Sequence, residues 1–160
     1  MFGNLFAVTE LLPWLGPIYL LAVAWPLART DIRVHRLPNR LTLPLLPIAL
    51  LSQGAAAVLG GDWGRFGSAL GCAGLAFAIG LAVNRTRALG MGDVKLATGI
   101  TWVLAWFSPV QPLIWLATSF GLATAVVLFL FAKKKTNMGR SIALGPYLLA
   151  GFFIALALSF

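Results

Sequence analysis

The sequence predicts an all-α integral membrane protein with about six transmembrane helices, and three observations support this. Apolar residues make up 60% of the 160 positions and charged residues 10%, and the mean hydropathy is +0.92. Soluble domains average about 45–50% apolar and about 25% charged residues, so a water-soluble fold would lack the charges to cover its surface. The apolar residues also form long runs separated by short basic clusters. Helices are expected because they satisfy their own backbone hydrogen bonds in lipid.

Six apolar runs are the expected helices, since a spanning helix needs about 20 residues, with a range of about 17–25. Pro13, Pro17 and Pro26 are expected to kink or end the first helix, and residues 60–62 (Gly-Gly-Asp) to close the second as a turn. The fourth run is short and is expected to be tilted or sunk among the others. We interpret the whole chain, 1–160, as one membrane domain without a soluble domain. The runs cover about 5–28, 41–59, 66–83, 94–107, 110–132 and 142–160.

The basic residues predict the orientation. A net charge of +8 can indicate nucleic-acid binding. Here, however, eleven of the twelve basic residues fall in alternate loops, which is the pattern of membrane topology, so no nucleic-acid partner is expected. The positive-inside bias places these loops in the cytoplasm and both termini outside, with anionic lipid headgroups as expected contacts. The three clusters are Arg29, Arg33, Arg36 and Arg40; Arg85, Arg87 and Lys95; and Lys133, Lys134, Lys135 and Arg140, with Arg65 on the opposite side.

Only four residues are acidic, and two of them fall on the same predicted face. Asp31 follows the first apolar run and Asp93 precedes the fourth, whereas Glu10 and Asp62 fall on the outer side. Two carboxylates that lie close together share one proton, because both do not ionise easily. One can then activate water as a general base while the other protonates the scissile carbonyl. Such a pair hydrolyses peptides without a metal or a nucleophilic side chain.

Glycines flank the second aspartate in the stretch GMGDVKL, residues 90–96. Gly90 and Gly92 would allow a tight turn and the close approach of another chain segment. A helix that begins near Asp93 would favour its ionised form through the helix dipole.

Each aspartate also has a simpler interpretation. Asp31 could be a solvated loop residue paired with Arg29 or Arg33, and Asp93 could cap the fourth helix. His35, among arginines, is expected to be a solvated histidine rather than a ligand.

Two motifs taken together resemble the type IV prepilin peptidases, membrane aspartic proteases with a Gly-x-Gly-Asp signature. The first is ARTDIRVHRLPNRLT, in which Asp31 is followed by Leu37-Pro38-Asn39 and Leu41-Thr42, and the second is GMGDVKL. Residues 142–149, IALGPYLL, are similar to the family's third apolar block, although Ala143 stands where the family often has proline, and Leu37 where isoleucine is commoner.

The resemblance implies an aspartic endopeptidase that removes the basic leader of a type IV prepilin or pseudopilin at the cytoplasmic face of a bacterial or archaeal cell membrane. Asp31 and Asp93 correspond to its catalytic pair. Gly90, Gly92 and Lys95 belong to the second motif, the lysine without an assigned role. Pro38 and Asn39 are expected to shape the turn into the second helix, with Asn39 as its N-cap.

Many members of that family carry a cytoplasmic insert with paired Cys-x-x-Cys motifs, associated with N-methylation of the trimmed pilin. This chain has one cysteine, Cys72, which can form neither an internal disulfide nor a Cys-rich zinc site. We therefore expect the short, peptidase-only form, with no Cys-rich methylase insert, no metal, no cofactor and no methyl transfer.

Three other hypotheses remain. A small cation- or proton-coupled transporter could use the acids as ion ligands, but no further polar residue continues a path through the predicted bundle. A presenilin-like Gly-x-Gly-Asp protease would carry a Tyr-Asp pair, whereas Thr30 precedes Asp31 here. A structural membrane subunit would not need both aspartates.

Overall fold

The computed structural model describes residues 8–87, 89–133 and 143–159. Throughout these ranges the regular structure is helical, which confirms the predicted all-α class. Four helical stretches are long and apolar enough to cross a membrane. The predicted number of six spans and the sides of the two termini stay predictions. The four stretches are Val8–Val34, Asn39–Gly60, Trp63–Arg85 and Gln111–Ala132.

The first helix extends further than its apolar run. A 3₁₀ turn, η1 (Leu12–Trp14), contains Pro13 and leads into α2 (Leu15–Val34). Pro26 lies inside α2 without ending it, and the helix stops where His35 adopts a left-handed conformation with φ 51°. As a result, Asp31 lies in the last turn of α2, where it is buried.

The second span consists of two pieces. Pro38 precedes the short α3 (Asn39–Thr42), which is followed by α4 (Leu45–Gly60). The Tyr19 hydroxyl of α2 donates a hydrogen bond of 2.9 Å to the carbonyl of Leu41, which ties α3 to α2. Gly61, with φ 76°, ends α4 in the turn expected at residues 60–62.

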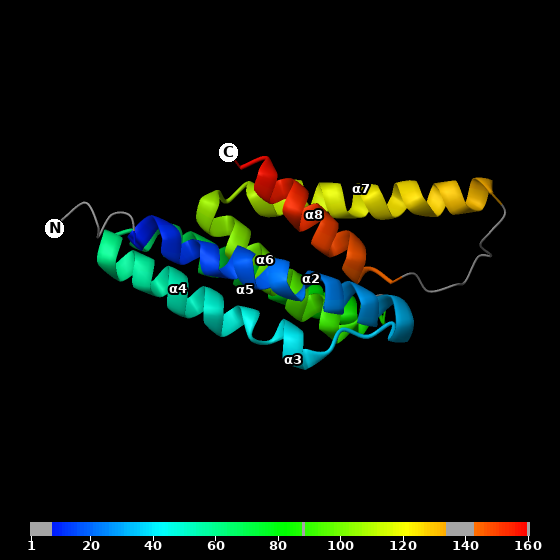
Figure 1. Cartoon of the computed structure of the whole chain (residues 1–160), viewed down its shortest axis with the longest axis horizontal. Coiled ribbons are helices and arrows are strands. Elements are labelled where there is room, and N and C mark those ends of the chain that lie inside the picture. Colours follow the sequence, from blue (N-terminus) through cyan, green and yellow to red (C-terminus); the bar gives the residue numbers. More distant parts are fainter. Residues whose placement is uncertain (1–7, 88, 134–142, 160) are drawn as a thin grey trace.

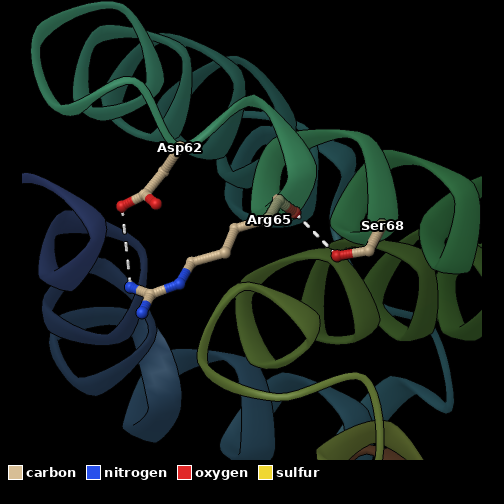
Figure 2. A network of polar contacts seen from close by, with 3 residues as sticks. All are labelled: Asp62, Arg65 and Ser68. Carbon is tan, nitrogen blue, oxygen red and sulfur yellow. Dashed lines mark hydrogen bonds and ion pairs between the residues drawn. The ribbon is translucent and has the colours of Figure 1, made fainter.

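The start of α5 (Trp63–Arg85) carries a surface ion pair. Asp62 Oδ2 lies 3.7 Å from Arg65 Nη1, and the Ser68 hydroxyl donates a hydrogen bond of 2.9 Å to the Arg65 carbonyl (Figure 2). This group lies at the end of the bundle near the N-terminus (Figure 1), away from the ends of α2 and α5. Asp62 is therefore accounted for by a local contact.

Helix α6 (Met91–Phe107) is the centre of the bundle, as Figure 1 shows. It packs against α3, α4, α5, α7 and α8, and most of its residues from Val94 to Trp106 are buried. This confirms the expectation that the short fourth run is sunk among the other helices. At 17 residues, α6 is not one of the four candidate spans.

Helices α7 (Gln111–Ala132) and α8 (Gly145–Ala157) form a closely packed pair on one side of the bundle (Figure 1). The Trp115 indole N–H donates a hydrogen bond of 2.9 Å to the carbonyl of Leu148. Beyond Ala123, α7 has no further buried residue. The run predicted at 142–160 is shorter in the structure, and both its end residues lie outside the described part of the chain.

Figure 1 shows that α2, α5 and α7 all end at the same end of the bundle. The basic residues at these three helix ends therefore fall at one end of the bundle, as the charge pattern predicts. Lys134, Lys135 and Arg140 of the third cluster lie outside the described residues.

Gly151 allows the close contact between α7 and α8. A Cβ atom there would lie 2.8 Å from the backbone nitrogen of Ser119. We expect Gly151→Ala to force the helices apart, at a cost of roughly 1–3 kcal/mol, the usual range for overpacking. Thermal unfolding in detergent should show a lower midpoint. Gly121→Ala is the matched control, because a Cβ there meets nothing within 4 Å, and an equal loss in both variants would contradict this packing.

Candidate active site

A cavity of about 620 Å³ brings the two predicted motifs together, because both Asp31 and Asp93 line it. These residues are 62 positions apart in the chain, and one comes from the end of α2 and the other from the start of α6. The rest of the wall comes mainly from α5, α6, α7 and α8. It consists of His35, Ala76, Ile79, Gly80, Val83, Leu89, Gly90, Ala97, Thr101, Trp115, Leu116, Phe120, Ala143, Leu144 and Leu148.

Asp31 is buried, with 4% of its surface exposed. Its Oδ2 accepts a hydrogen bond of 2.7 Å from the backbone N–H of Gly145, the first residue of α8. The first N–H groups of a helix have no partner within the helix, so the carboxylate satisfies one of them. This placement does not fit the alternative in which Asp31 is a solvated loop residue.

Asp93 lies in the first turn of α6, outside the four candidate spans. Its Oδ1 is buried and has no hydrogen-bond partner among the described residues. Burial raises the pKa of Asp93 to about 6; the negative charge of Asp31 adds to this rise, and a hydrogen bond with the Gly90 backbone opposes it. The helix-dipole argument, which favours an ionised Asp93, is therefore outweighed by desolvation. Asp93 also interacts with the backbone of Gly90, the N-cap residue of α6. This contact partly supports the alternative in which Asp93 caps that helix.

The two glycines of the second motif are needed for close approach. A Cβ on Gly90 would lie 3.0 Å from Asp93 Oδ2, and a Cβ on Gly92 would lie 2.9 Å from Leu37 Cβ and 3.2 Å from its carbonyl oxygen. Gly90 has φ −70°, so a left-handed turn is not the reason for glycine there. Gly92 thus brings the start of α6 against the loop that follows Asp31.

Lys95 also connects the two motifs. Its Nζ donates a hydrogen bond of 3.0 Å to the side-chain oxygen of Asn39. The prediction that Asn39 caps the second helix is wrong: Pro38 is the N-cap of α3, and Asn39 is the first helical residue, with its side chain turned to Lys95. The carbonyl of Pro38 accepts hydrogen bonds from the backbone N–H groups of Leu41 and Thr42.

Two residues of this site, Gly145 and His35, were not predicted from the sequence. Gly145 was noted only as part of the block IALGPYLL, although Pro146 is a recognisable signal for a helix start. His35 is exposed, as expected, but it also lines the cavity beside the carboxylates. The described residues contain no cluster of three or more His, Cys, Asp or Glu side chains that could hold a metal ion.

This arrangement suits acid–base chemistry. Two carboxylates in one cavity, close enough for one charge to raise the pKa of the other, favour the state in which the pair holds one proton. In that state the ionised member can accept a proton from water, and the protonated member can donate one to a carbonyl oxygen.

Comparisons with known proteins agree with the motifs. Residues 18–132 match the type IV leader peptidase family. The prepilin peptidase EppA of Methanothermobacter thermautotrophicus is 34% identical over 125 residues, which cover 78% of this chain and 31% of the relative's length. The chain thus spans about a third of that relative. No solved structure matches the chain significantly.

The raised pKa of Asp93 predicts a pH-dependent stability. Because the folded protein holds this proton up to about pH 6 and the unfolded chain releases it near 3.8, stability should fall as the pH rises between these values, by up to roughly 3 kcal/mol. Asp93→Asn, which cannot ionise, should gain stability relative to the wild type between pH 4 and 7. Thermal unfolding across this range measures the difference. Asp62→Asn is the control for an exposed aspartate, and parallel pH curves for Asp93→Asn and the wild type would contradict the prediction.

Proposed function

Because the chain belongs to the type IV leader peptidase family, we propose that it is an aspartic endopeptidase that removes the leader of a prepilin or pseudopilin, with Asp31 and Asp93 as its catalytic pair. The observation that carries this proposal is that two carboxylates from separate motifs, the buried Asp31 and the partly buried Asp93, line one cavity and interact electrostatically. Peptide hydrolysis by such a pair needs only a water molecule and a positioned carbonyl.

The contacts around the pair support the same function. The two motifs touch at two points. Gly92 packs closely against Leu37, and Lys95 donates a hydrogen bond to Asn39. Positioned groups of this kind matter because acid–base catalysis depends on geometry to within a fraction of an ångström. We assign Gly90, Gly92, Lys95, Pro38 and Asn39 supporting rather than catalytic roles.

The cavity suits a substrate that is apolar on one side of the scissile bond. Apart from the two aspartates and His35, its wall carries Thr101 as the one hydroxyl side chain among otherwise apolar or glycine positions. α5 and α7 both line it but barely contact each other. Ile79 of α5 is 56% exposed and Phe120 of α7 is 50% exposed. An apolar segment could therefore enter from the lipid side between these two helices.

The orientation that we propose puts the pair at the cytoplasmic face. The basic ends of α2 and α5 lie at the same end of the bundle as the start of α6, and the positive-inside bias assigns that end to the cytoplasm of the cell. Anionic headgroups would neutralise these loops and let a basic leader approach. The same apolar cavity wall is unfavourable for the rival transporter, since an ion path needs polar groups beyond the two acids.

Removing either carboxylate should abolish cleavage. We expect Asp31→Asn and Asp93→Asn each to lower the rate of prepilin cleavage by at least about 10³-fold in purified protein reconstituted in lipid, because each removes one half of the acid–base pair. Asp62→Asn, which breaks only the surface ion pair, should cleave normally. A folded variant of Asp31 or Asp93 that cuts at the normal rate would refute the catalytic pair.

Filling the cavity should block the substrate. Ala76→Phe adds an aromatic ring to a position on the cavity wall, whereas Ala78→Phe adds the same ring to an exposed position of α5 outside the wall. We expect the first variant to raise KM or abolish cleavage, and the second to behave as the wild type. Equal cleavage by both variants would mean that the substrate does not occupy this cavity.

A further inference from the structure

The two carboxylates of the cavity have different surroundings, although each lies near the first turn of a helix. Asp31 Oδ2 receives a direct backbone hydrogen bond of 2.7 Å from Gly145. That N–H begins α8, a helix of 13 residues, so the positive end of the helix dipole faces the same oxygen. A hydrogen bond to a charged acceptor is shorter and stronger than one to a neutral acceptor. These contacts stabilise negative charge on Asp31.

Glycine at position 145 makes this contact possible. A Cβ atom there would lie 2.7 Å from Asp31 Oδ2 and 3.1 Å from its Cγ. The first distance is shorter than a Cβ contact allows and the second is tight, so a side chain at 145 would shift the carboxylate away from the start of α8. Pro146 follows at the first turn of the helix, where the absence of an N–H costs nothing.

Asp93 is less completely hydrogen-bonded, although a hydrogen bond with the Gly90 backbone favours its ionised form. Its Oδ1 is buried and has no hydrogen-bond partner among the described residues. A buried ionised oxygen without a partner is costly, whereas a protonated one can donate to a water molecule or to a substrate carbonyl. The rise of the Asp93 pKa to about 6, caused first by burial and then by the charge of Asp31, agrees with this environment.

Resting on the peptidase function proposed above, we infer that the single proton of the pair is on Asp93 and the charge is on Asp31, and that Gly145 is the positioning residue that maintains this asymmetry. Asp31 is then the general base and Asp93 the general acid. This reverses the assignment that the helix dipole of α6 alone would give.

The assignment defines the direction of each proton transfer. Asp31 takes a proton from water as the water oxygen bonds to the scissile carbonyl carbon, and Asp93 gives its proton to the carbonyl oxygen, which produces a gem-diol. Asp31 then passes its proton to the amide nitrogen as the C–N bond breaks. One hydroxyl of the diol returns its proton to Asp93, so the products are a carboxylic acid and an amine, and the pair is restored.

Carboxyl NMR can test this directly, because the chain contains three aspartates, Asp31, Asp62 and Asp93. Protein labelled with ¹³C at the aspartate carboxyl gives three signals, which the three single Asp→Asn variants assign. At about pH 5, below the Asp93 pKa of about 6, we expect the Asp93 signal at the position of a carboxylic acid and the Asp31 signal at that of a carboxylate. The reverse assignment, or two signals that move together and equally, would overturn the inference.

Gly145→Ala tests the role of the glycine in the same spectrum. Displacing Asp31 from the start of α8 removes its hydrogen bond with Gly145 and should change the chemical shift of the Asp31 signal, while Gly71→Ala, where a Cβ meets nothing within 4 Å, should leave all three signals unchanged. Unchanged signals in Gly145→Ala would show that Gly145 does not position Asp31. The NMR experiment needs no substrate, so a negative NMR result would overturn the proton assignment without bearing on cleavage. If the NMR signals are as expected but the wild type does not cleave a prepilin, the peptidase function itself would be contradicted.

Discussion

The energetic cost of placing two carboxylates in one largely apolar cavity is the constraint on which the rest of this structure depends. Two negative charges in a poorly solvated site repel each other, and each also loses its hydration. The fold accommodates the pair because the two carboxyl groups have different hydrogen-bonding surroundings. Asp31 receives a backbone hydrogen bond from the start of α8, and burial raises the pKa of Asp93 so that it holds a proton to about pH 6. The unequal pair is more stable in this cavity than a doubly charged one, and it is also the form that acid–base hydrolysis requires.

Close backbone approach is the means by which the chain assembles this pair. The carboxylates come from segments 62 positions apart, and these segments meet where Gly92 packs against Leu37. Gly145 brings the start of α8 against Asp31, and Gly90 leaves room for the side chain of Asp93 within the second motif. None of these positions has a positive φ, so their conformational freedom is secondary. The bond between Lys95 and Asn39 adds a polar link across the same junction. The three sequence blocks are therefore joined by direct contacts around one cavity.

Much of this could be predicted from the sequence because the signals were local. Hydropathy identified the helical runs, and the scarcity of acidic residues singled out Asp31 and Asp93. Periodicity could not predict that α2 would continue past its apolar run, because burial of Asp31 against α8 is a tertiary effect. For the same reason Asn39, a good local N-cap, instead pairs with Lys95. The partner of Asp31 is 114 positions away, and no local pattern reveals such a contact.

The claim that Asp31 and Asp93 act together as one catalytic pair is tested most directly by the structure of the protein bound to a substrate-like peptide whose scissile amide is replaced by a hydroxyethylene group. If the two aspartates act as one pair, the hydroxyl lies within hydrogen-bond distance of both carboxylates, and the apolar side chains that follow it occupy the cavity between α5 and α7. A hydroxyl that contacts only one aspartate, or a peptide bound outside the cavity, would contradict this claim.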